Sequence, residues 1–230
     1  MNDAPLVSVI IPVLNEVSAL PGTLTHLSAL PGSFEVIVAD GGSTDGTTDA
    51  AAGHPLTPRV VTARGRAHQL NAAGAQATGE IMVVLHADTR LPVSAYESLT
   101  AALRDFEIVG GNFTLRFDGG DRFSRILGAI YAVQRRLGIY YGDSAVWARA
   151  ATFAALGGFR PLSIMDDYDF VRRMEGYGCT ACLPGPAITS ARRWQRAGLA
   201  RTVTSWVVIR WLYLAGVPAG PLARLYRQVR

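Results

Sequence analysis

Lysine is absent from the 230 residues of this sequence, and every basic side chain in it is an arginine. Schiff-base enzymes, pyridoxal-dependent enzymes and P-loop nucleotidases each require a lysine amine, so the sequence excludes these three classes. A Gly-x-Gly-x-x-Gly motif is also missing after the first apolar stretch. This second absence argues against a dinucleotide-binding oxidoreductase.

Cysteine is scarce, with Cys179 and Cys182 forming a single C-x-x-C pair. A structural zinc site uses four ligands, and no second Cys or His pair lies near these two. We therefore expect both to be small apolar residues of a strand or loop. A secretory leader is missing as well, because the first apolar run extends only from Leu6 to Ile11. The sequence predicts a cytoplasmic protein.

The apolar run Ile81 to Leu85 is the most informative stretch of the chain. Its β-favouring side chains predict a strand that is buried on both faces of a sheet. His86, Asp88 and Thr89 follow at its carboxyl end, where open α/β sheets bind ligands, and a helix is expected to open at Leu91-Pro92. A carboxylate oxygen there suits a divalent cation that bridges phosphates. The alternative is that Asp88 only caps the next helix or shapes the turn.

The first half of the chain alternates between apolar runs and helical stretches. The apolar runs occupy residues 6–11, 34–39, 60–62 and 81–85. We expect three intervening helices, which begin near residue 19, at Ser43 or Thr44, and at residue 67. Asn15 is a candidate cap for the first of them. This alternation predicts one globular α/β domain with a mostly parallel, doubly wound sheet.

Polar side chains stand at three successive strand ends: Asn15 and Glu16, then Asp40, then Asp88. Right-handed crossovers bring such ends to one edge of the sheet. Turn formation is the alternative explanation for Asp40 and for Asp45. The repetition at three ends favours a binding site.

These motifs resemble glycosyltransferase family 2, whose members have the GT-A fold. The matching segments are V-I-I-P-V-L-N-E at 9–16, V-A-D-G-G-S-T-D-G-T at 38–47 and H-A-D at 86–88. The segments G-R-A-H-Q-L-N-A-A at 65–73 and L-H-A-D-T-R-L-P at 85–92 are similar to a compact bacterial subgroup labelled radical-SAM/selenodomain-associated. The resemblance extends from about Leu6 to the C-terminus.

The resemblance implies a nucleotide-diphospho-sugar donor, with uracil as the expected base. It places Pro12, Asn15, Glu16 and Asp40 around the nucleoside. It places Arg66 at the diphosphate, a task that suits a planar and permanently charged guanidinium.

The resemblance also implies a divalent cation, Mn²⁺ or Mg²⁺. Asp88 matches the last acid of the family's D-x-D motif, which binds the metal, and His86 stands where the first acid is expected. Imidazole is a better ligand for Mn²⁺ than for Mg²⁺, so the identity of the metal stays open. Gly41 replaces the second acid of the usual D-D-G-S motif.

Residues 106–190 are expected to bind the acceptor, and residues 1–105 the donor. The segment Y-Y-G-D-S-A-V-W at 140–147 resembles the family's G-D segment, which places Asp143 on the acceptor side. Asp167 aligns with the family's general base, and Asp166 is its neighbour on the acceptor side. We expect only one of the two to face the acceptor, because successive helical residues point about 100° apart. The alternative is that these acids are ordinary residues of a helix N-terminus.

The second half also carries predictable local structure. Alternation over residues 109–117 predicts a strand, and Asp121 is expected to cap a helix that extends to about residue 136. Arg172 and Arg173, one turn after the acids, are expected to balance their charge.

Residues 191–230 form a tail with eight arginines, no acidic residue and several aromatic side chains. Its apolar run at 203–217 is broken by Arg210 and is too short to span a bilayer. The tail predicts either an interfacial helix on anionic lipid at the inner membrane face, or a buried helix that closes the catalytic domain or a homodimer interface. Nucleic acid is disfavoured, because the net charge is only +4 and the catalytic half is not basic.

The resemblance thus implies an inverting, metal-dependent glycosyltransferase of the hexosyltransferase type, with a catalytic domain at 1–190. It moves a sugar to an acceptor hydroxyl, and the sugar and the acceptor stay open, with a lipid-linked molecule among the candidates. A sugar-nucleotide pyrophosphorylase is one alternative, although its Gly-rich N-terminal loop is absent. A non-catalytic nucleotide-sugar-binding protein is the other, because His86 departs from the family motif.

Overall fold

The computed structural model describes residues 5–119, 121–190 and 199–229 of the chain. The strands are β1 (Val7–Val13), β2 (Phe34–Asp40), β3 (Arg59–Thr62), β4 (Ile81–Val84), β5 (Thr89–Arg90), β6 (Ile108–Phe117), β7 (Trp147–Arg149) and β8 (Cys179–Thr189). The helices are α1 (Leu20–Ser28), α2 (Thr47–Ala52), α3 (Arg66–Gly74), α4 (Ala95–Ala102), α5 (Arg122–Arg136), the short 3₁₀ helix η1 (Gly142–Ser144), α6 (Ala150–Ala155), α7 (Asp166–Tyr177), α9 (Leu199–Leu214) and α10 (Ala219–Val229).

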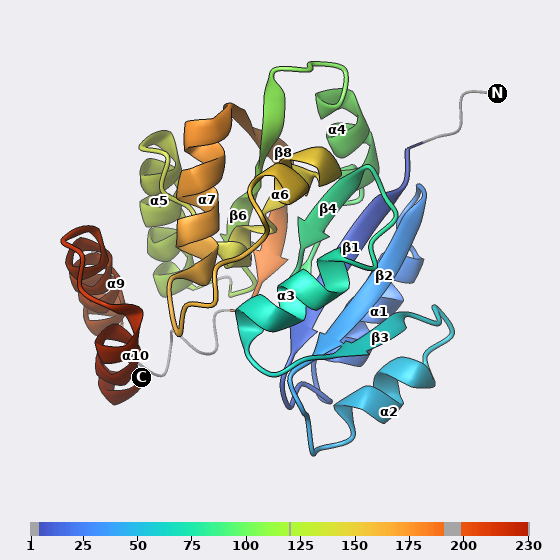
Figure 1. Ribbon diagram of the computed structural model, residues 1–230, viewed down its shortest axis with the longest axis horizontal. Coiled ribbons are helices and arrows are strands. Elements are labelled where there is room, and N and C mark those ends of the chain that lie inside the picture. Colours follow the sequence, from blue (N-terminus) through green and yellow to red (C-terminus); the bar gives the residue numbers. More distant parts are fainter. Residues whose placement is uncertain (1–4, 120, 191–198, 230) are drawn as a thin grey trace.

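The strands form one sheet in the order β3-β2-β1-β4-β7-β6-β8-β5 (Figure 1). In the first half, β1 pairs in parallel with β2 and β4, and β2 pairs in parallel with β3. In the second half, β7 runs antiparallel to both β4 and β6. β6 and β8, also in the second half, pair in parallel, and β8 runs antiparallel to β5. The predicted α/β sheet is confirmed, and the half that the sequence assigns to the donor contributes strands that pair with one another only in parallel.

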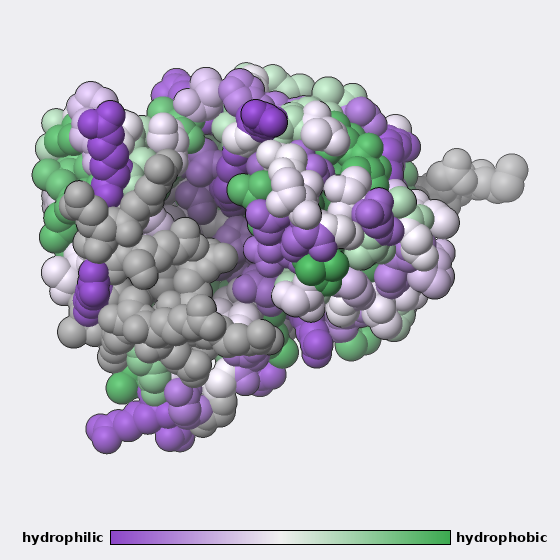
Figure 2. Space-filling view, turned by 90° about the horizontal axis from the view of Figure 1, so that it is seen from below, coloured by the Kyte–Doolittle hydropathy of each residue, from purple (hydrophilic) through white to green (hydrophobic). Residues whose placement is uncertain are grey.

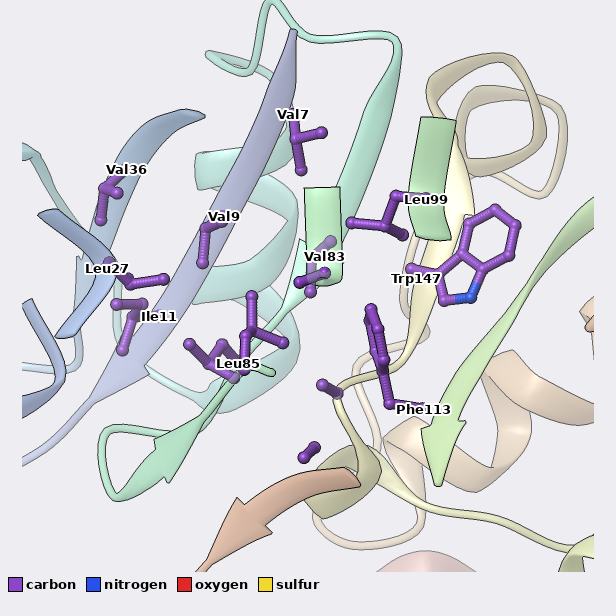
Figure 3. Packing of buried hydrophobic residues seen from close by; sticks show 14 of the residues in the cluster. Val7, Val9, Ile11, Leu27, Val36, Val83, Leu85, Leu99, Phe113 and Trp147 are labelled. Atoms are coloured by element: carbon purple, nitrogen blue, oxygen red, sulfur yellow. The ribbon is translucent and has the colours of Figure 1, made fainter. Parts of the chain in front are cut away.

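Helices cover both faces of the sheet, because the strands are apolar on both sides. Val9 and Ile11 point to the face covered by α1, α2 and α4, together with Val83 and Leu85 (Figure 3). Ile10, between them in sequence, points to the face covered by α3 and α7. This two-sided burial is typical of parallel strands and holds the strand ends in fixed positions.

Some predicted helix starts are wrong. Asn15 does not cap α1, because its φ is +57° and its side chain accepts a hydrogen bond from Thr44 N instead. Gly46, and not Ser43 or Thr44, precedes α2. The helix expected at Leu91-Pro92 begins only at Ala95, because the short strand β5 first pairs with β8.

Two predictions for the second half are confirmed. Asp121 caps α5, since its side chain accepts a hydrogen bond from Ser124 N at 3.0 Å. Cys179 and Cys182 lie in strand β8, where both are free and exposed.

The tail helices α9 and α10 pack against the rest of the chain. Trp206 joins Leu127 and Tyr131 in one apolar cluster, and Ile209 joins Met165 in another. None of the helices in the described ranges has the length and apolar character needed to cross a membrane. The tail therefore contacts the domain as a closing element would, and the division of the chain at residue 190 stays a prediction.

Candidate active site

A cavity of about 240 Å³ opens beside the carboxyl end of β4. It brings together residues that lie far apart in sequence, and Figure 2 shows a recessed hydrophilic area near the middle of the face seen from below. The cavity is lined by Arg66, His86, Asp88, Tyr131, Tyr141, Asp143, Ile164, Met165, Asp166, Asp167, Thr189, Ser190, Trp206, Ile209 and Tyr226. Six of the predicted site residues are among them.

The other four predicted site residues, Pro12, Asn15, Glu16 and Asp40, do not line this cavity. They lie at the ends of β1 and β2, where the two loops are joined by hydrogen bonds. Asn15 N donates to Ser43 Oγ at 2.9 Å, and Glu16 N donates to Thr47 Oγ1 at 2.8 Å. Donor-side residues thus form a second group at the same sheet edge.

The side chain of Asp40 stabilises the turn that follows β2. Its carboxylate is buried and accepts hydrogen bonds from Gly42 N at 2.8 Å and from Ser43 N at 3.1 Å. Gln69 of α3 supports the same edge, because its Nε2 donates to Val13 O at 2.8 Å and to Ala39 O at 2.6 Å. No pattern in the sequence indicates this role of Gln69, although the residue lies within the segment at 65–73.

Arg66 is the first residue of α3 and reaches across the cavity to α7. Its Nη1 donates to Asp166 Oδ2 at 2.7 Å, and its Nη2 lies 3.1 Å from His86 Nε2. The guanidinium therefore stands between the acids of α7 and the end of β4, where Asp88 lines the same cavity. Arg172 and Arg173 are expected from the sequence to balance the charge of the acids at the start of α7. Arg173 pairs with Asp169 at 2.7 Å, whereas the partner of Asp166 is Arg66.

Asp167 contacts the short helix η1. Its Oδ2 accepts a hydrogen bond from Gly142 N at 2.8 Å. A methyl group on Gly142 would lie 2.7 Å from Arg66 Nη2 and 3.1 Å from both Asp167 Oδ2 and His86 Nε2, so this glycine keeps the space open. Asp166 and Asp167 both border the cavity, so their directions on the helix do not decide between them.

Asp143 is buried and follows Gly142 directly in η1. Its Oδ2 accepts a short hydrogen bond from the Tyr131 hydroxyl, and its Oδ1 has no hydrogen-bond partner among the described residues. Burial raises the pKa of Asp143 to about 7; the hydrogen bond from Tyr131 opposes this rise, and the charge of Asp167 adds to it. Asp143 is thus a carboxyl group that titrates near neutral pH.

Four aspartates and one arginine line this cavity, so carboxyl groups outnumber guanidinium groups there. Burial alone would lower the pKa of Arg66, but the charges of Asp166 and Asp167 outweigh burial and raise it. The pKa of Asp166 is raised by burial, against the opposing effect of Arg66. An excess of negative charge increases the proton affinity of every group nearby, and it is a ready site for an added cation.

The backbone that leads into α7 is strained. Met165, directly before Asp166, has a φ of +66°, and Ala145, directly after η1, has a φ of +51°. Residues other than glycine adopt this region at a cost, and such residues cluster at functional sites. The sequence carries no signal for either conformation.

The aromatic and apolar part of the cavity was also missed. Tyr131 of α5 packs against Trp206 of α9 with ring centroids 5.3 Å apart, and Ile209 and Tyr226 of the tail complete this wall. A helical spacing of apolar residues predicts burial but does not say whether the buried face borders a core or a cavity.

The tail is also tied to α7 by a polar contact. The Tyr213 hydroxyl donates to Asp169 Oδ1 at 2.9 Å. The other oxygen of Asp169 accepts from Arg173 Nε at 2.7 Å. The end of α7 that carries Asp167 is therefore held from the tail side as well.

This α/β sheet, with acids gathered beside the end of its central strand, has the GT-A fold. A mannosyltransferase from Pyrobaculum calidifontis, solved with GDP-Man and Mn²⁺, superposes with a TM-score of 0.70 at 23% identity and covers 99% of this chain and 70% of that one. A glucosyl-3-phosphoglycerate synthase from Mycobacterium tuberculosis, solved with Mn²⁺, UDP and glucosyl-3-phosphoglycerate, has a TM-score of 0.60 at 22% identity, with coverage of 93% and 81%. These similarities show the fold.

The chain belongs to glycosyl transferase family 2, whose profile matches residues 8–160. Among its curated relatives is an undecaprenyl-phosphate 4-deoxy-4-formamido-L-arabinose transferase from Aeromonas hydrophila, which is 33% identical over 164 residues. The match covers 65% of this chain and 49% of that relative, so the chain spans about half the length of the enzyme it resembles.

Proposed function

We propose that the protein transfers a hexose from a nucleotide-diphospho-sugar, with a UDP-sugar as the first expectation, to an acceptor hydroxyl with inversion at the anomeric carbon. The observation that carries this proposal is the convergence of Arg66, Asp88, Asp143 and Asp167 on one cavity, from four separate parts of the chain. A cationic group for a diphosphate thus lies opposite carboxylates that can accept a proton.

The donor would extend from the loops after β1 and β2 to the cavity. Asn15, Glu16 and Asp40 would contact the nucleoside, with Pro12 beside them, and Arg66 would contact the diphosphate. Arg66 already holds one carboxylate at 2.7 Å, and a phosphate oxygen presents the same kind of acceptor. Binding of the donor would therefore compete with Asp166 for this guanidinium.

The residues at the end of β4 fit a divalent cation that arrives with the diphosphate. In the part of the chain that the structure describes, no three His, Cys, Asp or Glu side chains gather into a complete metal cage. Cations that bridge phosphates need only one or two protein ligands, because phosphate oxygens and water complete the shell. Asp88 would hold the ion, with His86 as the second ligand once Arg66 no longer occupies its Nε2. The bound ion would stabilise the negative charge of the leaving diphosphate.

Asp167 would act as the general base. It would take the proton of the acceptor hydroxyl as the oxygen of that hydroxyl forms a bond to the anomeric carbon. The bond from this carbon to the diphosphate oxygen breaks on the opposite side, and its electron pair leaves with the diphosphate. Arg66 would then face the charge that develops there.

The acceptor would carry a neutral hydroxyl next to an apolar body, and we propose that it is lipid-linked. The curated relative is named for undecaprenyl phosphate, a lipid-linked molecule. In this chain, Trp206, Ile209 and Tyr226 line the same cavity as Asp167, which suits an apolar group beside the reacting oxygen.

Turnover of a labelled sugar nucleotide by Asp167→Asn tests the proposal. A general base contributes typically 10²- to 10⁴-fold, so we expect kcat to fall by roughly that factor while donor affinity changes little. Asp166→Asn is the matched variant and should act mainly through donor binding, since Asp166 pairs with Arg66.

Near-normal turnover in a folded Asp167→Asn would place the base elsewhere, with Asp143 as the next candidate. Binding of the donor without any turnover by the unmodified protein would instead indicate a non-catalytic binding protein. Release of nucleoside triphosphate from a sugar nucleotide and pyrophosphate would identify a pyrophosphorylase.

A further inference from the structure

Large apolar side chains are exposed mainly at one end of the molecule. Six of the eleven exposed large hydrophobic residues of the described chain belong to α5, its last cap residue and α9. They are Ile126, Val133, Leu137, Val208, Trp211 and Leu214. We call this set the α5–α9 face. Both helices lie at the left end of the molecule in Figure 1.

The exposed residues occupy the outer sides of helices whose inner sides are buried. In α5, Val133 and Leu137 are one turn apart and 56% and 70% exposed, whereas Tyr131 is only 5% exposed. In α9, Trp211 is 62% exposed, whereas Ile209 is 3% exposed. Because Tyr131 and Trp206 also line the cavity, these two helices separate the active site from the α5–α9 face.

The charged residues within α5 and α9 have a single sign, and two exposed acids, Asp118 and Asp121, directly precede α5. Arg122, Arg125 and Arg136 on α5 and Arg201 on α9 are exposed. No acidic residue occurs in 122–137 or in 199–229. In Figure 2, hydrophobic and hydrophilic residues adjoin along the same left end of the molecule. Apolar side chains flanked by arginines are typical of helices that lie in the interface of an anionic membrane.

A second copy of the chain is a poorer partner for this surface. A twofold interface places a patch against itself, so two surfaces that are both rich in arginine would face each other. Like charges that are brought together at an interface cost binding energy. An anionic surface instead offers the opposite charge at every arginine.

We infer that the α5–α9 face docks the protein on an anionic lipid bilayer. Trp211 and the aliphatic residues would enter the headgroup region, and the arginines would contact lipid phosphates. This docking does not depend on the proposed donor, metal or base. It would bring the apolar wall of the cavity close to the membrane. Only the use of this closeness, access to a lipid-linked acceptor, rests on the proposed function.

Flotation with vesicles tests the inference on the full chain. We expect binding to phosphatidylcholine vesicles that contain phosphatidylglycerol, weak binding to pure phosphatidylcholine, and loss of binding at high salt. The double variant Arg122→Ser with Arg125→Ser should bind about 25-fold more weakly, because each arginine near the surface is worth about fivefold. Val133→Ser with Trp211→Ser should also lose binding while its melting temperature is kept.

The loop after α4 provides matched controls. Phe106 is 86% exposed, and Arg104 is exposed beside it. Phe106→Ser and Arg104→Ser remove the same kinds of side chain outside the α5–α9 face, so they should leave flotation unchanged. Equal loss of binding in these controls would overturn the assignment of the face.

Other outcomes would also overturn the inference. One is the absence of flotation with anionic vesicles at low salt. Another is a dimer, measured by sedimentation, that Val133→Ser with Trp211→Ser dissociates, because the face would then bind a second copy. A third is binding to nucleic acid, lost in the same arginine variants, without binding to vesicles. Donor turnover should persist in the variants, which separates this test from that of the proposed function.

Discussion

Replacement of Asp143 by asparagine should make the protein more stable at neutral pH. Asp143 is buried, one of its oxygens has no partner among the described residues, and its pKa is raised from 3.8 to about 7. A carboxyl group with a raised pKa binds its proton more tightly in the folded state than in the unfolded state. It therefore stabilises the fold fully below pH 3.8, and this stability is lost as the pH rises towards 7.

The size of the effect follows from the two pKa values. Each pH unit between them changes the free energy of unfolding by about 1.4 kcal/mol. Between pH 5 and pH 8, the free energy of unfolding of the unmodified protein should therefore fall by about 3 kcal/mol relative to that of Asp143→Asn. Most of this fall should occur below a pH of about 7, the pKa of Asp143 in the folded state. Asparagine is uncharged at every pH and can still accept the hydrogen bond from Tyr131, so it imitates the protonated acid.

Urea unfolding of the ligand-free protein at pH 5, 6, 7 and 8 is the assay. Asp105→Asn, which removes the charge of an exposed aspartate, controls for a general effect of net charge. A constant difference in the free energy of unfolding between the unmodified protein and Asp143→Asn across this range would refute the reasoning. The carboxyl would then be ionised throughout, and its burial would be compensated by another group.

Three further predictions concern the donor, the ion pair and the tail. Calorimetry should show that UDP binds more tightly in Mn²⁺ than in EDTA and that Asp88→Asn removes this difference; equal affinities in the unmodified protein would contradict it. Arg66→Met should weaken UDP binding, and it should lower stability because Asp166 loses its partner. Adding Asp166→Asn should restore stability but not UDP binding, and restored UDP binding would disprove the role of Arg66. Trp206→Ala should destabilise the fold by about 2 kcal/mol, which is less than the loss of a fully buried tryptophan costs. Trp211 is 62% exposed, so Trp211→Ala should destabilise the fold by less than about 0.5 kcal/mol, and equal values for the two variants would refute the orientation of α9.

The sequence predicts the strands of the first half well, because each strand is a continuous apolar run that ends in polar residues. The resemblance to the family, and no local pattern, assigns Asp88, Asp143 and Asp167 to one site, and all three line the cavity. The strand predictions succeed because apolar runs and strand ends are local features. A carboxyl at a strand end is restricted to one edge of the sheet whatever its neighbours are.

The rest depends on contacts that no local pattern contains. Asn15 is a suitable cap by residue type, but its backbone turns into the left-handed region and its side chain binds the next loop. The pairing of Arg66 with Asp166 joins residues 100 positions apart. For the tail, the sequence offers membrane and core as alternatives, whereas the structure turns Trp206 inward and Trp211 outward on one helix.

The packing of Trp206 on Tyr131 has a consequence for the synthesis of the chain. Phe117, Leu127 and Tyr131 leave the ribosome well before α9, and they are at most 5% exposed once the tail has packed near them. Until then they present an aromatic surface that is open to misassociation, and the wall of the cavity does not yet exist. A nascent chain can thus complete the parallel strands of its first half early, whereas this wall of the cavity forms only when the last helices have packed.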